Sequence, residues 1–258
     1  MNRYVLLCCV LLGFPSFAKT SDLINSDYYS KTQTTWGGIG LIQNPTARFA
    51  EDGEFTFGIS TEAPYTRLYG TIQYFPWAEF TLRYTEGTYA PYNLGSQQTW
   101  KDKGMDFKLR LLEESDKRPG IALGFIDVGG TGAYASEYIV ASKRFNNLDT
   151  TLGVAWGHLG EHGNIGNPLG WLKDSRTEYD TLGGQLNFGN FFAGKKAALF
   201  TGLEYFTPVP NLSVKLEYDT SDYLAVDGKE INYFKTGDIF EVNSRFNIAL
   251  NYRLATSD

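Results

Sequence analysis

The feature that most constrains the fold is an alternation of apolar and polar residues with a period of two, which continues along most of the chain. Phe55, Phe57 and Ile59, for example, are separated by Thr56 and Gly58. Successive side chains of a β-strand point to opposite faces, so this pattern predicts strands with one apolar and one polar face. The pattern occurs in eleven segments, residues 55–59, 68–74, 80–84, 105–111, 121–125, 138–140, 152–156, 182–188, 199–205, 212–218 and 246–254. No segment keeps the 3.6-residue period of an amphipathic helix, and we therefore expect an all-β protein.

Composition agrees with this expectation. The chain has 258 residues, of which 16% are aromatic and 28 are glycine, and this mixture favours strands and tight turns. Residues 37–43 and 230–235 are candidates for additional strands, and we expect at least one of them to pair. Since single-chain bacterial barrels have an even number of strands, a closed sheet of about 10–12 strands fits the pattern.

The N-terminal part has the features of a secretory signal. Arg3 gives a positive charge, residues 4–12 form a short apolar run, and residues 16–18 form a small-x-small cleavage site, so we expect Sec-type signal cleavage near Ala18. The chain then divides into a signal peptide (1–18), a flexible N-terminal arm (19–35) and a β-barrel domain (36–258).

Periodicity alone does not tell which way the apolar face points. It points inward in a soluble sandwich or lipocalin-like barrel, and outward to lipid in a membrane barrel. Long connections at residues 87–103 and 157–179 contrast with tight turns at 76–78 and 145–148, as in outer-membrane barrels. Aromatic residues also concentrate at strand ends, as interfacial girdles do. We therefore expect an antiparallel transmembrane β-barrel in the outer membrane of a Gram-negative bacterium.

The polar faces carry mixed charges, which we expect to line the barrel lumen. They are Arg83, Lys108, Arg110, Glu137, Lys143, Lys215 and Glu217. One interpretation is a salt-bridge network that fills a narrow lumen, and the other is a polar track for an anionic or hydroxyl-rich polysaccharide. Sugar binding would also use aromatic platforms, which the long loops offer in Tyr89, Tyr92, Trp100, Trp171 and Tyr179.

The sequence offers no catalytic or metal-binding constellation, so we expect neither an enzyme nor a cofactor. The glycine-rich residues 129–132 are expected to form a turn between antiparallel strands rather than a phosphate-binding loop. His158 and His162 lie in a loop with no helix to align them as metal ligands. Both cysteines lie within residues 1–18, which leaves no thiol after cleavage. The net charge of −6 argues against a nucleic-acid partner.

Several longer motifs resemble the YjbH/GfcD family, outer-membrane proteins of exopolysaccharide and group 4 capsule loci. The resemblance extends from about Trp36 to Tyr252. Its motifs are GLIQNPTAR at residues 40–48, FPW at 75–77, KLRLLEES at 108–115, DVGGTG at 127–132, SEY at 136–138 and VASKR at 140–144.

The resemblance implies a barrel component of exopolysaccharide or capsule export or assembly. Its partners would be outer-membrane lipid, polysaccharide, and lipoprotein and periplasmic proteins of the same locus. Family members are much longer, which implies either a short member or the N-terminal barrel of a larger architecture. Two alternatives stay open: a general porin-like or structural outer-membrane barrel, and a soluble periplasmic β-rich binding module.

Overall fold

The computed structural model describes residues 31–62, 65–91, 97–176, 188–221, 225–226, 229–230 and 245–252. Nearly all regular structure in this part is one antiparallel sheet of 11 strands, and it contains no α-helix, so the all-β expectation is confirmed. Among these residues no helix is long and apolar enough to span a membrane.

The large sheet has the order β1-β2-β3-β4-β5-β6-β7-β9-β10-β13, with β8 paired to β9. Its strands are β1 (Phe55–Glu62), β2 (Tyr65–Phe75), β3 (Ala78–Pro91), β4 (Thr99–Leu112), β5 (Gly120–Ile126), β6 (Ser136–Phe145), β7 (Leu148–Gly157), β8 (Ile165–Gly166), β9 (Lys196–Phe206), β10 (Leu212–Asp219) and β13 (Arg245–Tyr252). A separate pair is formed by β11 (Ala225–Val226) and β12 (Lys229–Glu230). Short 3₁₀ turns are η1 (His158–Gly160) and η2 (Phe188–Asn190).

Ten of the eleven alternating segments form the ten strands of the main path. The remaining one, residues 182–188, lies outside the described residues except for Phe188, which is in η2. The candidate strand at 37–43 does not form, because this stretch makes only isolated bridges, at Gln33–Ile39 and Gly40–Pro45. Of residues 230–235, only Glu230 is described, in β12.

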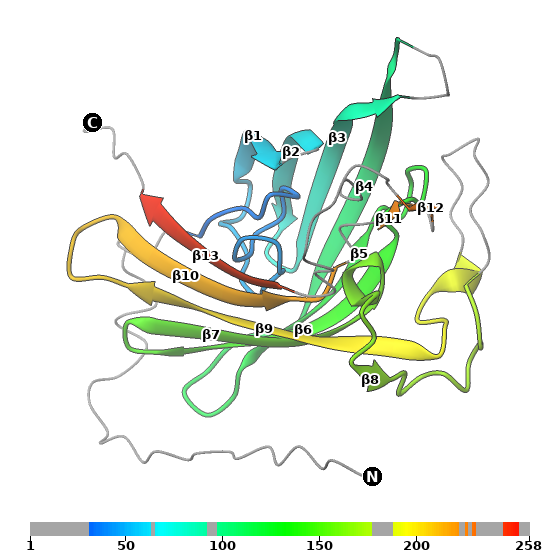
Figure 1. Ribbon diagram of the computed structural model, residues 1–258. Helices are drawn as coiled ribbons and strands as arrows, with labels where there is room; N and C mark the ends of the chain where they lie inside the picture. The colour runs from blue at the N-terminus through cyan, green and yellow to red at the C-terminus, as the bar shows by residue number, and fades with distance from the viewer. Residues whose placement is uncertain are drawn as a thin grey trace.

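The sheet curves strongly around residues 31–50, which we call the inner segment (Figure 1). Strands β1 and β13 are the two ends of the path, and no pairing joins them among the described residues. The inner segment includes the end of the arm expected at 19–35, and Thr34 in it is buried. The rest of that arm, residues 19–30, and the signal peptide lie outside the described residues.

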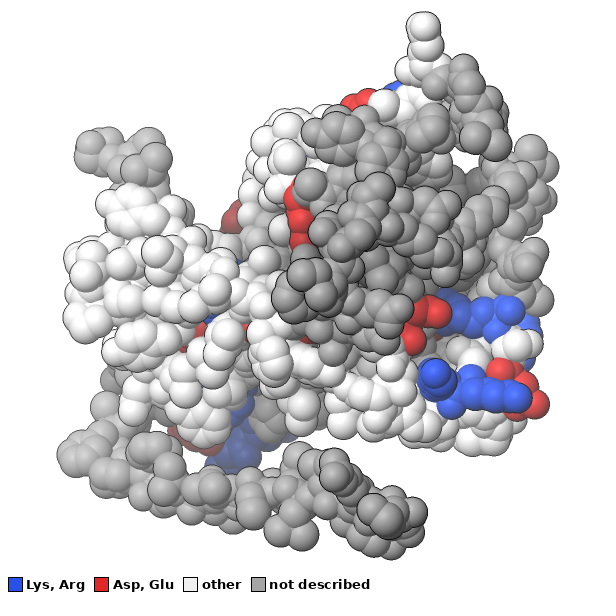
Figure 2. All heavy atoms as spheres, viewed as in Figure 1, with Lys and Arg blue, Asp and Glu red and all other residues white. Residues whose placement is uncertain are grey.

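The outward face of the sheet is apolar and exposed. Phe57 is 65% exposed and Ile248 is 76% exposed, and both alternate with residues of the opposite face. Further exposed apolar side chains are Leu68, Leu82, Leu111, Ile139, Leu152, Leu199 and Leu216. In Figure 2 the surface over β9, β10 and β13 is almost free of charge. The inward face carries the charges, which reverses the arrangement of a water-soluble β-protein.

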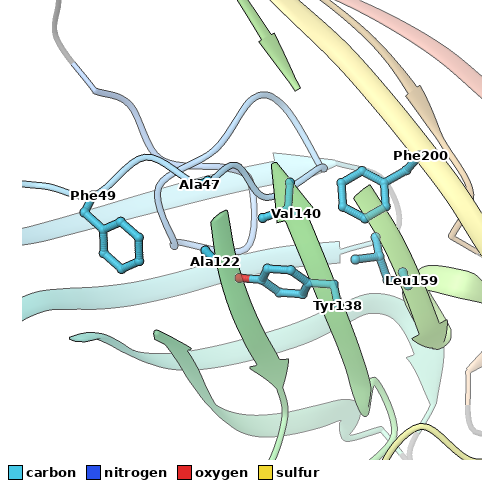
Figure 3. Packing of buried hydrophobic residues seen from close by; sticks show 8 residues of the cluster. Ala47, Phe49, Ala122, Tyr138, Val140, Leu159 and Phe200 are labelled. Carbon is cyan, nitrogen blue, oxygen red and sulfur yellow. The ribbon is translucent and has the colours of Figure 1, made fainter. Parts of the chain in front are cut away.

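One sector of the inward face is apolar. Ala122, Tyr138 and Val140 of the inward wall pack with Ala47 and Phe49 of the inner segment (Figure 3). The same cluster includes Ala155, Leu159 and Phe200. The inner segment therefore binds the sheet through an apolar contact on one side, and the charged contacts described next hold it elsewhere.

Candidate functional site

The inner segment is held by buried charged side chains that project from the inward face of the sheet. Glu79, Arg83, Lys108, Lys215 and Glu217 are all at most 4% exposed. Such burial costs free energy unless each charge is paired or hydrogen-bonded. Most of the partners are backbone groups of the inner segment, as the next three contacts illustrate.

Glu217 on β10 accepts hydrogen bonds from three consecutive backbone amides. Its carboxylate oxygens lie 3.0 Å from Ile42 N, 2.8 Å from Gln43 N and 3.1 Å from Asn44 N. Asn247 of β13 donates to the same carboxylate at 2.8 Å. The amides converge because residues 41–44 form a tight turn closed by a bond from Leu41 N to Asn44 O at 2.9 Å. Pro45 has no N–H, so the run of consecutive amide donors ends at Asn44.

Two lysines bind the carbonyl groups of the same segment. Lys215 Nζ donates to Gly40 O at 3.1 Å and to Leu41 O at 3.0 Å. Lys108 Nζ donates to Ile39 O at 3.0 Å and to Arg48 O at 2.8 Å. An ammonium has three donors and no acceptor, so it suits a turn that presents several carbonyl oxygens.

Glu79 completes the Lys108 contact. Its Oε1 lies 3.1 Å from Lys108 Nζ and accepts a hydrogen bond from Ile39 N at 3.2 Å. One backbone position, residue 39, is thus bound through both its N–H and its carbonyl group.

Arg48 is a residue of this site that the alternation pattern did not reveal. It forms a two-bond contact with Asp149, at 2.8 Å and 2.7 Å, and it also pairs with Glu114. Burial works against the charged guanidinium, but the two carboxylates outweigh it and raise the pKa of Arg48. Arg48 closes the GLIQNPTAR motif, so the motif was the sequence signal that it has a role.

The inner segment contacts β1 at one end of the sheet path and β10, the neighbour of β13, near the other end. Gln43 Nε2 donates to Glu62 of β1 at 2.5 Å, while the backbone of Gln43 binds Glu217 of β10. Thr35 O also accepts a hydrogen bond from Ser60 of β1 at 2.6 Å. A single stretch of chain therefore connects β1 with the β10–β13 end of the sheet.

An aromatic and cationic cluster anchors the start of the inner segment. Trp36 packs edge-on against Tyr134 with ring centroids 5.0 Å apart, and Arg67 lies 4.1 Å above the Trp36 ring. Arg83 approaches the same ring to 4.8 Å. His158 packs against Tyr134, and its burial next to two arginines lowers the pKa of His158 to about 3. The imidazole is therefore neutral at physiological pH.

The predicted charged set is only partly in the interior. Arg83, Lys108, Lys215 and Glu217 are inside, and Arg110 lies on the same face with its guanidinium 4.7 Å from the Phe49 ring. All five contact the inner segment, so the structure brings them together around residues 31–50.

The interior position expected for Glu137 and Lys143 is not what the structure has. Glu137 shares a face with Phe125 and Trp156 in the register, opposite to inward-facing Tyr138. It is nevertheless buried, because Arg176 binds it twice at 2.8 Å. Lys143 is also one of the outward-facing residues of β6, and its Nζ lies 3.1 Å from the Glu114 carboxylate.

Of the five predicted sugar platforms, Trp100 and Trp171 have described side chains, and these two have different surroundings. Trp100 packs against Tyr134 within the buried cluster, whereas Trp171 is 79% exposed. Tyr89 is in β3, but its side chain lies outside the described part of the structure, as do Tyr92 and Tyr179 entirely.

Two cavities border the inner segment among the described residues. A cavity of about 70 Å³ lies between Arg48, Asp149 and Phe206, and another of about 30 Å³ lies beside Glu79. Each of these volumes can hold water molecules. Among the described residues, no group of three His, Cys, Asp or Glu side chains is arranged to hold a metal ion.

Comparison with known proteins gives a consistent answer. The family model described as exopolysaccharide biosynthesis protein YbjH matches residues 32–257. A protein of Escherichia coli K12 named "Uncharacterized lipoprotein YjbH" is 39% identical over 231 residues, which is 86% of this chain and 33% of the relative. The chain thus spans about a third of that relative's length. No solved structure matches. The chain belongs to the YjbH family of exopolysaccharide biosynthesis proteins.

Proposed function

We propose that the chain is a non-enzymatic outer-membrane β-barrel that takes part in exopolysaccharide export or assembly, with its interior closed by the inner segment. The observation that carries the membrane part is the reversed polarity of the sheet, apolar and exposed outside and charged inside. Water would not stabilise such an outward face, whereas lipid does.

The topology of the sheet supports its closure. The main path has ten strands that alternate in direction, so β1 and β13 would pair antiparallel, as an even strand count requires. Gln43 binds Glu62 of β1 and Glu217 of β10, the neighbour of β13, which supports a short distance between the two ends. We propose that β1 and β13 form the seam of the barrel.

The family supports the link to exopolysaccharide, and the name of the E. coli relative describes a lipoprotein, which supports a place in the cell envelope. The filled interior favours a closed component that docks partners over an open polymer channel. Lipoprotein and periplasmic proteins of the same locus are the proposed partners.

A substitution at the outward face separates a membrane barrel from a soluble module. Leu152, in the middle of β7, is 57% exposed, so Leu152→Lys would be harmless in a protein surrounded by water. In a bilayer it should cost about 2–4 kcal/mol. Val209 is 53% exposed in the turn between β9 and β10, and Val209→Lys is the matched control.

The readout is the heat-modifiable shift in gel electrophoresis after refolding into detergent and lipid. We expect the parent protein and Val209→Lys to shift, and Leu152→Lys to lose much of the shifted band. A protein that stays in solution without detergent, or equal behaviour of both variants, would refute the membrane barrel. Deleting the gene and measuring surface polysaccharide tests the export role, and unchanged polymer under inducing conditions contradicts it.

A further inference from the structure

The connection between β7 and β9 folds over the outside of the sheet. Phe125 and Trp156 belong to the outward face, yet Phe191 lies 4.9 Å from Phe125 and Phe192 lies 5.0 Å from Trp156, between ring centroids. Trp156 Nε1 also donates to Asn167 at 2.7 Å. Here the described loop residues, and not the strands, therefore form the outermost surface of the molecule.

Two parts of this connection are fastened together. Asn167 N donates to Lys195 O at 3.0 Å, and Gly194 N donates to Lys173 O at 3.0 Å. The side chain of Asn167 donates to Phe192 O and Gly194 O at 2.8 Å and 2.7 Å. These bonds fix the positions of residues 167–173 relative to residues 192–196.

The surface that results combines apolar and basic side chains. We call Trp171, Leu172, Lys173, Lys195 and Lys196 the loop patch. Trp171 is 79% exposed and Leu172 is 51% exposed, and Lys195 and Lys196 are exposed as well. Within the described residues, neither Lys195 nor Lys196 forms an ion pair. Figure 2 shows basic side chains gathered, next to acidic ones, at the end of the sheet near β8 and the start of β9.

The loop patch lies where an apolar wall meets a polar rim. Lys196 begins β9 in the register of inward-facing Phe200, and Leu199 of the outward apolar face lies about 10 Å farther along the strand. Aromatic side chains and lysines with long apolar stems occupy this level of a bilayer, with their charged ends toward the headgroups.

We propose that the loop patch binds the phosphorylated headgroups of lipids in the outer leaflet, an inference that rests on the proposed membrane barrel. Phosphate oxygens pair with Lys195 and Lys196, and Trp171 and Leu172 enter the adjacent acyl region. A polysaccharide is the weaker occupant, because the loop packs on the outward wall and not across the inward face.

Native mass spectrometry of the full-length protein in neutral detergent tests this, with diphosphorylated lipid A as the probe. We expect Lys195→Gln/Lys196→Gln to weaken binding about 25-fold, since each lysine at an anionic lipid surface contributes about fivefold. Trp171→Ala should weaken it as well. The control, Lys117→Gln/Arg118→Gln, removes the same charge from the exposed β4–β5 turn at the opposite end of the strands and should leave binding unchanged.

The proposal would be overturned by equal binding of dephosphorylated lipid A, by equal loss in the control variant, or by lysine-dependent binding of polygalacturonate in place of lipid A. Inorganic phosphate alone should not compete at lipid concentrations, and competition would assign the site to a free anion instead. If the heat-modifiable shift is intact while lipid A fails to bind, this inference fails and the barrel stands. If the shift is absent, the proposed function itself fails.

Discussion

Glu217 is the residue on which the inner segment depends most. Its carboxylate accepts hydrogen bonds from three backbone amides and from the Asn247 side chain, and Glu217 is 1% exposed. We expect Glu217→Gln to lower the free energy of unfolding by about 3 kcal/mol, because an amide group supplies one acceptor oxygen and places an N–H₂ against donors. Urea titration in detergent micelles measures the change.

The matched control for this variant is Glu113→Gln. Glu113 is 77% exposed and, among the described residues, pairs only with Arg110 at 3.6 Å, so its substitution should change stability by less than about 0.5 kcal/mol. Similar effects from the two variants would mean that the contact with residues 42–44 contributes no more to the free energy of unfolding than an exposed ion pair does.

Asp127 should make stability depend on pH. Burial, and then the nearby Asp102, raise the pKa of Asp127 to about 8 from an ordinary value of 3.8. Between these values the folded protein holds a proton that the unfolded chain has lost, so the free energy of unfolding falls as pH rises from about 4 to 8. The slope should be about 1 kcal/mol per pH unit and should level off above pH 8.

Asp127→Asn removes this dependence while keeping an oxygen for the amide of Tyr134, which lies 3.1 Å away. Asparagine also accepts the positive φ of 56° at this position. Urea midpoints at several pH values should give parallel curves for the two proteins above pH 8 and diverging curves below it. Curves that stay parallel throughout would rule out a proton on Asp127.

At the scale of elements, the inner segment fits the sheet tightly enough to exclude single methyl groups. Gly37 has φ +110°, and a Cβ there would lie 2.7 Å from the Tyr69 ring. Gly53 has φ +80°, with nothing within 4 Å of an added Cβ. Gly53→Ala should therefore cost about 1 kcal/mol from the backbone alone, and Gly37→Ala about 2 kcal/mol more from crowding.

Urea titration of both glycine variants separates the two causes, since only the backbone cost is common to them. Equal losses would show that Tyr69 moves aside freely and that the inner segment is loosely packed. A larger loss in Gly37→Ala supports a closely fitted interior.

The inner segment should also block ion flow. Removing residues 31–50 would leave Lys108, Lys215 and Glu217 around a water-filled space. In planar bilayers we expect discrete conductance steps from the shortened protein and none from the intact one. If the shortened protein does not refold, Arg48→Ala/Glu217→Gln loosens the same segment at both of its charged contacts. Steady conductance of the intact protein would contradict a filled interior.

At the scale of the whole molecule, alternation predicted the strands well because a strand's two faces have different surroundings. Phe55 to Ile59 and Phe246 to Tyr252 follow the rule closely, since their apolar side chains are exposed and small or polar residues alternate with them. To predict which way the apolar face points, the loop lengths were needed as well. The observed exposure agrees with that prediction.

The failures have physical causes. Polarity predicts an interior position for Glu137. Arg176, on a loop 39 residues away in sequence, instead covers it from outside. Residues 37–43 alternate like a strand, yet their backbone groups are satisfied by Glu79, Lys215 and Glu217 instead of by a neighbouring strand. Alternation carries no information about partners so distant in sequence.

The contact between Ile42 and Glu217 joins residues 175 positions apart, and this separation has a kinetic consequence. Closing so long a loop is entropically unfavourable until most of the intervening strands have paired. The start of the described chain therefore acquires its binding site only after β10 has formed. We expect refolding to be slow, with a late phase in which residues 31–50 become protected from proteolysis, well after the strands themselves have assembled.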